Sequence, residues 1–195
     1  MPYDPADFPP ATSRAAIANA MTGPACFTAA LNLQEWIRDL LQAGFTPGER
    51  LVHPPAHRQR AFEVTDLAGL LTARAEYGSH WPTRTMLSPT RDESWWASCP
   101  GLIPTGAILA AVRRLEPTGP DAGALLEAAG WTATTNITGE ITAWSAPDAS
   151  RAAARVSEGP DRGWLIYRND LPRAPVVSAA LATPPGVVTA LALAS

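Results

Sequence analysis

Arginine is the residue type through which this sequence could bind a ligand. All 15 basic residues among its 195 are Arg, and Lys is absent. Arg presents a rigid fork of N–H donors that fits phosphate or carboxylate, and exposed aromatic rings can stack on single-stranded bases. Arg151 and Arg155 lie four residues apart on a predicted strand, so they share one of its faces. A binding function would therefore depend on a few Arg side chains and the aromatic residues near them.

The candidate binding residues fall in two parts of the chain. The set is Arg74, Arg84, Arg151, Arg155, Arg168, Arg173, Trp81, Trp164, Trp95 and Trp96. Three interpretations are open for them. In the first, the Arg residues are solvated and the Trp rings lie in the core. In the second, the residues contact nucleic acid. In the third, they form a protein interface, where Arg and aromatic residues are also enriched.

Trp95 and Trp96 are adjacent, and adjacent residues of a strand point to opposite faces. At most one of them can pack beneath a helix. The other must face solvent, another part of the chain or a partner. We therefore expect the outer Trp to mark an interface.

Several enzyme classes are excluded by residue type. Without Lys there is no Walker-A loop, no protein-kinase site and no Schiff-base chemistry. The sequence also has no Gly-x-Ser-x-Gly elbow and no dinucleotide-binding Gly-x-Gly-x-x-Gly after a strand. We accordingly predict no catalytic residue and no cofactor, while an unrecognised enzyme with a site between two halves of the chain stays open as an alternative.

The His and Cys residues give weak signals. His53 and His57 have helical metal-ligand spacing, but two Pro residues between them disfavour a helix, and a solvated loop is expected. His80 is expected at an exposed strand start. Cys26 and Cys99 are expected to be small buried hydrophobes, because free Cys is among the most buried residue types. The sequence therefore predicts no metal site.

The overall composition predicts a globular cytoplasmic protein. Hydrophobic residues make up 46% of the chain, and the formal net charge is −3, so no global basic field attracts nucleic acid. The N-terminus lacks the basic and apolar regions of a signal peptide, and no apolar run reaches the length of a membrane span. We expect no membrane partner.

An internal repeat is the most informative sequence feature. Residues 40–46 resemble 125–132, residues 72–78 resemble 153–159, and residues 96–112 resemble 177–192. In this alignment Arg74 corresponds to Arg155. It predicts a Pro/Ala-rich lead at 1–27, a first repeat at 28–116 and a second repeat at 117–195.

Each predicted repeat starts with a helix, continues with four or five short strands and closes with a helix. The predicted helices are 29–42, 105–115, 122–129 and 185–194. The predicted strands are 61–65, 71–77, 83–87 and 95–99 in the first repeat, and 132–136, 141–145, 151–157, 163–168 and 176–181 in the second. The expected fold class is α+β, a tandem repeat of antiparallel sheet units flanked by helices. Helices cover one face of each unit, and a pseudo-two-fold axis relates the two sheets.

The sequence resembles an actinobacterial, Streptomyces-type family of unknown function, the domain-of-unknown-function family 317, which is often found in tandem. The resemblance rests on the Leu-Leu-x-Ala start that leads to Gly-Trp, the Ser-Ala-Pro-Asp turn, the Arg-rich third strand, the Gly-Trp strand and the Pro-Pro-x-Val-Val-x-Ala-Leu end. It covers about 122–195 well and about 28–115 more weakly. The first copy departs by an insertion near 53–60 and by Pro82 after Trp81. The resemblance implies a plasmid, phage or integrated-element context and supplies no catalytic residues.

Together these features favour a non-enzymatic binding module. It would act through a protein–protein interface, as an accessory factor of a mobile-element or phage-type protein or as a homodimer. Direct DNA or RNA binding through an Arg/aromatic sheet face is the alternative, and its affinity would fall steeply with salt.

Overall fold

The computed structural model describes residues 33–47, 59–78, 81–92, 94–115, 119–137, 141–168 and 175–194. Within these ranges the side chains of 59–60, 77–78, 81–83 and 141 are not described. The predicted lead at 1–27, the residues Cys26, His53, His57, His80 and Arg173, and the side chain of Trp81 therefore lie outside the part of the chain that can be discussed.

The described chain follows the same order of elements in its two halves. The N-terminal half contains α2 (Leu33–Gln42), β1 (Thr46–Pro47), β2 (Gln59–Thr65), β3 (Leu71–Gly78), β4 (Trp81–Pro89), β5 (Ala97–Pro100) and α3 (Thr105–Val112). The C-terminal half contains α4 (Ala122–Ala128), β6 (Thr132–Thr135), β7 (Ile141–Ser145), β8 (Arg151–Val156), β9 (Gly163–Arg168), β10 (Val177–Ala179) and α5 (Pro185–Ala194). Of these elements, only the short strand β1 was missed by the sequence.

The ten strands of the described ranges form one open antiparallel sheet, with the order β1-β2-β3-β4-β5-β10-β9-β8-β7-β6. Each half is a meander of neighbouring strands, and β5 of the first pairs antiparallel with β10 of the second. The mixed α and β composition and the antiparallel pairing are as expected. The expectation of two separate sheets is corrected, because the two meanders join edge to edge into a continuous sheet.

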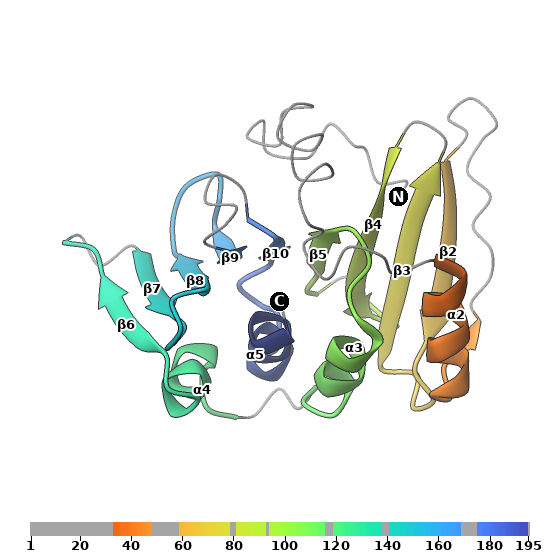
Figure 1. Ribbon diagram of the computed structural model, residues 1–195, viewed down its shortest axis with the longest axis horizontal. Coiled ribbons are helices and arrows are strands. Elements are labelled where there is room, and N and C mark those ends of the chain that lie inside the picture. Colours follow the sequence, from red (N-terminus) through yellow and green to blue (C-terminus); the bar gives the residue numbers. More distant parts are fainter. Residues whose placement is uncertain are drawn as a thin grey trace.

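The four helices of the described ranges lie along one side of this sheet (Figure 1). Between them and the sheet is a single core that includes Trp36, Trp131, Trp144 and Trp164. Trp36 Nε1 donates to the carbonyl of Ile103 at 2.7 Å, which fixes α2 to the segment before α3. No helix in the described ranges is long and apolar enough to span a membrane.

The helices that open each half end in the same way. Gly44 and Gly130 follow α2 and α4 with φ of +94° and +85°, a left-handed conformation that Gly adopts at no steric cost. The next amides, of Phe45 and Trp131, donate to carbonyls five residues back, and both side chains turn into the core. These are Schellman caps, in which a Gly ends the helix and a hydrophobic contact seals it. In each half of the chain, a Gly followed by an aromatic residue thus ends the opening helix and leads into the sheet.

The hairpins β2–β3 and β7–β8 also close alike. The Asp66 amide donates to the Leu71 carbonyl, and the Ala146 amide donates to the Arg151 carbonyl, each at 3.0 Å. The inner turn residues Gly69 and Ala149 both have positive φ, of +67° and +54°. Corresponding residues of the two hairpins are therefore 80 positions apart in the sequence.

Candidate interaction surface

The strand registers place each candidate Arg on one of two faces of the sheet. One face is covered by the helices; we call the other the open face. On β3, Leu71, Ala73 and Ala75 are fully buried beneath the helices, so the alternate residues of that strand lie on the open face. Arg74 is one of these, and Met86 lies opposite it on β4.

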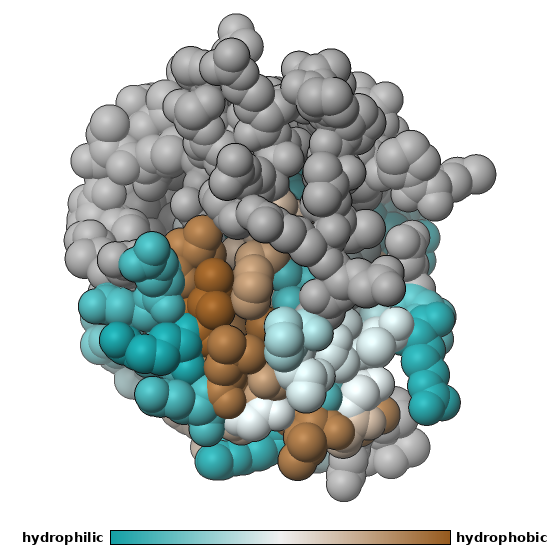
Figure 2. All heavy atoms as spheres, turned by 90° about the vertical axis from the view of Figure 1, so that its right-hand side faces the viewer, coloured by the Kyte–Doolittle hydropathy of each residue, from teal (hydrophilic) through white to brown (hydrophobic). Residues whose placement is uncertain are grey.

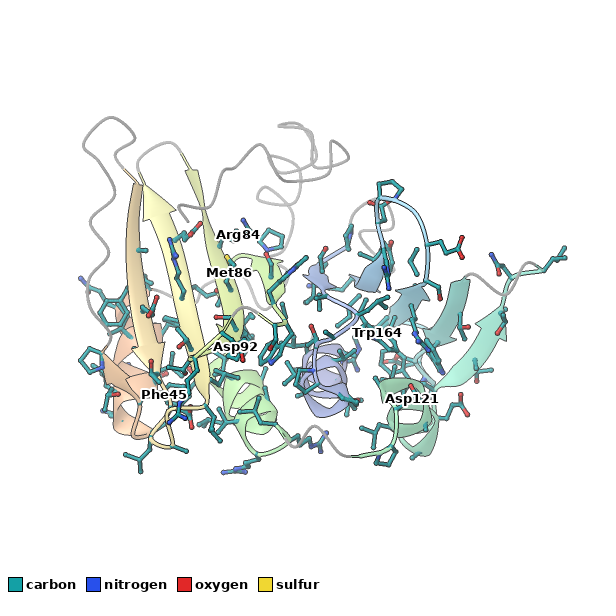
Figure 3. All side chains as sticks on the ribbon, turned by 180° about the vertical axis from the view of Figure 1, so that it is seen from behind. Phe45, Arg84, Met86, Asp92, Asp121 and Trp164 are labelled. Carbon is teal, nitrogen blue, oxygen red and sulfur yellow. The ribbon has the colours of Figure 1, made fainter. Side chains whose placement is uncertain are left out.

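Following the register from Arg74 defines a row of residues across the whole open face. The row is Glu63, Arg74, Met86, Ser98, Ser178, Leu165, Ala154, Ala143 and Thr134. Figure 3 views the molecule from behind, with Arg84 and Met86 on β4. The row passes through both halves without interruption, so the open face is one surface.

Arg74 and Arg84 lie on this face among acidic neighbours. Arg74 Nη2 pairs with the Glu76 carboxylate at 2.8 Å, and both side chains are largely buried. Arg84 Nε donates to Ser98 Oγ at 2.8 Å, and Glu63 lies opposite Arg74 on β2. The two Arg and two Glu residues balance in charge. This part of the open face is therefore polar and close to neutral, without an excess of positive charge for a phosphate backbone.

The Arg residues of β8 and β9 lie on the other face. Arg151 Nη1 donates to the carbonyls of Ala192 and Leu193, at 3.3 and 2.8 Å, and its guanidinium lies 6.0 Å from the centre of the Trp131 ring. A cation there complements the negative end of α5. Arg168 lies opposite Arg151 in register. These two residues thus belong to the helix-covered side of the sheet.

Arg155 is exposed and lies opposite the buried Trp164 on β9. In the sequence alignment of the two repeats, Arg155 corresponds to Arg74. The hairpin spacing instead makes Ala154 the counterpart of Arg74. A shift of one residue moves a strand side chain to the opposite face, so Arg74 and Arg155 point away from each other. The structure does not gather Arg74, Arg84, Arg151, Arg155 and Arg168 on one surface.

The Trp residues divide between core and surface. Trp164 is buried and its ring centre lies 5.4 Å from that of Trp144. Trp95 is 6% exposed and Trp96 is 39% exposed. One of the adjacent pair is thus buried and the other is at the surface, as predicted, but both precede β5, so the predicted strand over 95–99 is corrected at its start. Trp96 also connects the halves through its carbonyl, which accepts hydrogen bonds from the Ala180 amide at 2.9 Å and from Thr183 Oγ1 at 2.9 Å.

The open face over β6–β10 has a different character from the part over β2–β5. Its described residues are Thr132, Thr134, Ala143, Ser145, Ala152, Ala154, Val156, Leu165, Tyr167 and Ser178. None of them carries a formal charge, and none is fully buried. The sequence did not reveal this surface, because the charged residues of β8, Arg151 and Arg155, lie on the other face of the sheet. The Ala residues between those Arg residues were the available signal.

Further exposed apolar side chains lie at the opposite end of the sheet. Leu67 is 83% exposed and Leu70 is also exposed, both in the turn between β2 and β3. Figure 2 shows this end of the molecule, where hydrophobic residues of the described part gather at the lower edge and in a band beside hydrophilic ones. These leucines stand at a loop tip, apart from the open face over β6–β10.

Among the described residues, three groups have shifted pKa values. Burial, with a smaller effect from Asp161, raises the pKa of Tyr167 above its ordinary 10.0. Hydrogen bonds from Ser94 lower the pKa of Asp92, and hydrogen bonds from Ser150 lower that of Asp148. Both carboxylates lie in exposed turns. Their shifts therefore mainly reflect turn formation, with a smaller contribution at Asp148 from the charge of Arg151.

A surface hollow lies where the C-terminal end of α3 meets α4 and α5. Its lining includes Arg113, Arg114, Leu125, Thr189 and Leu193. The Thr189 hydroxyl already donates to the Pro185 carbonyl at 2.8 Å. Among the described residues, the lining contains no carboxylate, His or Cys. The hollow therefore lacks the groups that general acid–base or nucleophilic catalysis requires.

Other catalytic arrangements are also unsupported in the described residues. Cys99 is fully buried, and its Sγ lies 3.4 Å from the Pro100 carbonyl. No group of three or more His, Cys, Asp or Glu residues in the described ranges is placed to hold a metal ion. Comparisons with family models, with curated proteins and with solved structures find no match to this chain.

Proposed function

We propose that this chain is a non-enzymatic binding module that acts through a protein–protein interface, and that its partner binds the open face over β6–β10. The observation that carries the proposal is the absence of charge from the ten described residues of this surface. Depletion of charge is the compositional mark of the central part of a protein interface. A sheet face covered by helices on one side only leaves the other available to a partner.

The module is, on this proposal, a tandem repeat of one α+β unit. The support is the shared order of elements and the matching helix caps and hairpin turns. In addition, 80 residues separate corresponding positions of the β2–β3 and β7–β8 hairpins, and the same spacing separates those of the closing helices α3 and α5. Pro104 and Pro184 accept hydrogen bonds from the third and fourth amides that follow them, with the same pair of distances, 2.9 and 3.2 Å. An accessory role in a mobile element or phage-type protein rests on the family resemblance of 122–195 alone.

Direct nucleic-acid binding is disfavoured by the division of the candidate Arg residues between two faces. Phosphate contacts from a rigid sheet need several cations on one surface, and the contacts weaken with salt in proportion to their number. A mobility-shift assay with single- and double-stranded DNA and RNA at low salt tests this alternative. A salt-dependent shift would establish it in place of the protein interface.

A pair of matched variants tests the protein interface itself. Leu165→Glu introduces a charge at the centre of the uncharged surface, and Leu67→Glu introduces the same charge at the exposed β2–β3 turn. Proteins captured from cells that carry this chain are compared by quantitative mass spectrometry for the wild type and both variants. We expect a partner that is lost with Leu165→Glu and kept with Leu67→Glu. Equal recovery with the two variants would refute the proposed surface.

A further inference from the structure

The strand β6 forms one edge of the ten-stranded sheet. It pairs with β7 in unbroken register from Thr132 to Thr135, and all four of its residues are exposed. Its other side has no strand partner in the described structure. An edge strand presents a row of N–H and C=O groups that another strand can pair with.

In the described residues, β6 lacks three of the devices that protect an edge strand, which are charge, Pro and a β-bulge. Its sequence, Thr-Ala-Thr-Thr, contains no charged residue and no Pro, and the pairing with β7 contains no bulge. The residues around it, 131–137, are also uncharged, and Ile137 is fully exposed. Three of the four strand residues are β-branched Thr, which favours an extended backbone.

The opposite edge of the sheet differs. The described part of β1 is two residues long, and one of them is Pro47, which has no backbone N–H to donate. Addition of a strand is therefore disfavoured at β1 and open at β6. The asymmetry limits strand addition to one event, so it would yield a closed pair of chains and not a fibre.

We propose that β6 pairs antiparallel with β6 of a second copy of this chain, so that the sheet continues across a two-fold axis. The same type of contact already joins β5 to β10 within the chain, where Ser98 pairs with Ser178. A neutral strand pairs with itself without like-charge repulsion, which favours a second copy over a charged foreign strand. The axis is perpendicular to the sheet, so the open faces of the two copies form one surface.

This contact uses an edge and not the open face, so it stands independently of the proposed function. Its area is small, because strands of this length bury less than the roughly 1,200 Å² of a stable complex. The dimer is therefore weak and in rapid exchange with the monomer. Its two copies would present the proposed partner with two binding faces at once, which raises overall affinity without new contacts.

Sedimentation equilibrium over a wide range of concentrations tests the proposal. Wild type should show a reversible monomer–dimer equilibrium. Thr135→Lys, on the same strand but not on the open face, brings like charges together across the axis and should weaken association roughly tenfold. Thr46→Lys places the same residue on the β1 edge and should leave association unchanged. A wild type that stays monomeric at all concentrations, or equal effects of the two variants, would overturn the proposal.

A charge-swap pair separates loss of pairing from damage to β6. Thr135→Glu alone should weaken association as Thr135→Lys does. A mixture of the two variants should form a heterodimer at least as stable as the wild-type dimer, because opposite charges then meet across the axis. If the mixture stays monomeric, the substitutions act by disturbing the strand and the proposed pairing is wrong. Far-ultraviolet circular dichroism of each variant checks that the sheet is intact.

Discussion

Ser98 and Ser178 lie opposite each other across the junction of β5 and β10, at the centre of the ten-stranded sheet. They are 80 positions apart, the same spacing that separates the two hairpins and the two closing helices. On the open face, Arg84 donates to Ser98. On the other face, α3 and α5 pack against each other. The centre of the molecule is therefore held by corresponding segments of its two halves.

The packing of α5 against the end of α3 depends on Gly186. A Cβ at this position would collide with the backbone carbonyl and the Cβ of Arg114, whereas a Cβ at Gly106 on α3 would meet nothing within 4 Å. Gly186→Ala should destabilise the protein by about 1–3 kcal/mol through overpacking. Gly106→Ala should be neutral or stabilising by up to about 1 kcal/mol. Urea unfolding of both variants measures the difference, and equal midpoints would show that the helices separate freely.

Trp95 and Trp96 should respond in opposite ways to truncation. Trp95→Ala opens a cavity in the core and should cost about 3–5 kcal/mol of unfolding free energy. Trp96→Ala removes a largely exposed ring and should cost less than about 1 kcal/mol, because its structural contact with the second half is made by the backbone carbonyl. Thermal unfolding followed by calorimetry distinguishes the two. A large loss with Trp96→Ala would place its ring in the core.

The sequence predicted the elements well because local signals set them. Pro184 and Pro185 fix the start of α5, and Gly44 and Gly130 fix the ends of α2 and α4. The junction of the two meanders could not be predicted in this way. The pairing of Ser98 with Ser178 is a long-range contact with no local signature, since both lie in short strands without clear alternation.

The candidate surface was less predictable than the fold. The sequence alignment of 72–78 with 153–159 was displaced by one residue from the correspondence that the hairpin hydrogen bonds give. Such a displacement leaves strand positions almost unchanged and reverses the face of each side chain. It is the reason that Arg74 and Arg155 were expected together. The register of a strand is set by its turn and its core residues, and similarity of exposed residues is a poor guide to it.

Asp66 organises the β2–β3 turn from a buried position. Its carboxylate accepts hydrogen bonds from the amides of Ala68, Leu70 and Leu71 at 3.1, 2.7 and 2.6 Å, and the residue is 4% exposed. Asp66→Ala leaves these amides without their acceptor and should cost about 2–3 kcal/mol. Asp148→Ala, at the exposed β7–β8 turn, is the control and should cost less than about 1 kcal/mol. Similar costs for the two would mean that water replaces the Asp66 carboxylate.

Arg151 should act as a cap for α5. Its guanidinium donates to the carbonyls of Ala192 and Leu193 and lies over Trp131, so Arg151→Met removes the charge while keeping much of the apolar stem. The expected cost is about 1–2 kcal/mol, with faster hydrogen exchange confined to the last turn of α5. Arg155→Met, on the same strand but exposed, should leave α5 exchange unchanged. Binding of nucleic acid lost only with Arg151→Met would contradict a purely structural role.

Ionisation of Tyr167 should lower the free energy of unfolding at alkaline pH. Burial on the open face, and to a smaller extent Asp161, raises the pKa of its hydroxyl above the ordinary 10.0. The folded state therefore holds this proton more tightly than the unfolded state does, and the resulting stability is complete below pH 10 and falls as the pH rises through the folded pKa. Tyr167→Phe should remove this part of the decline above pH 10 without changing its slope at lower pH. Urea unfolding at pH 8 and at pH above 10 measures this decline in the free energy of unfolding. Identical pH profiles for wild type and variant would show that Tyr167 ionises as freely in the folded protein as in the unfolded one.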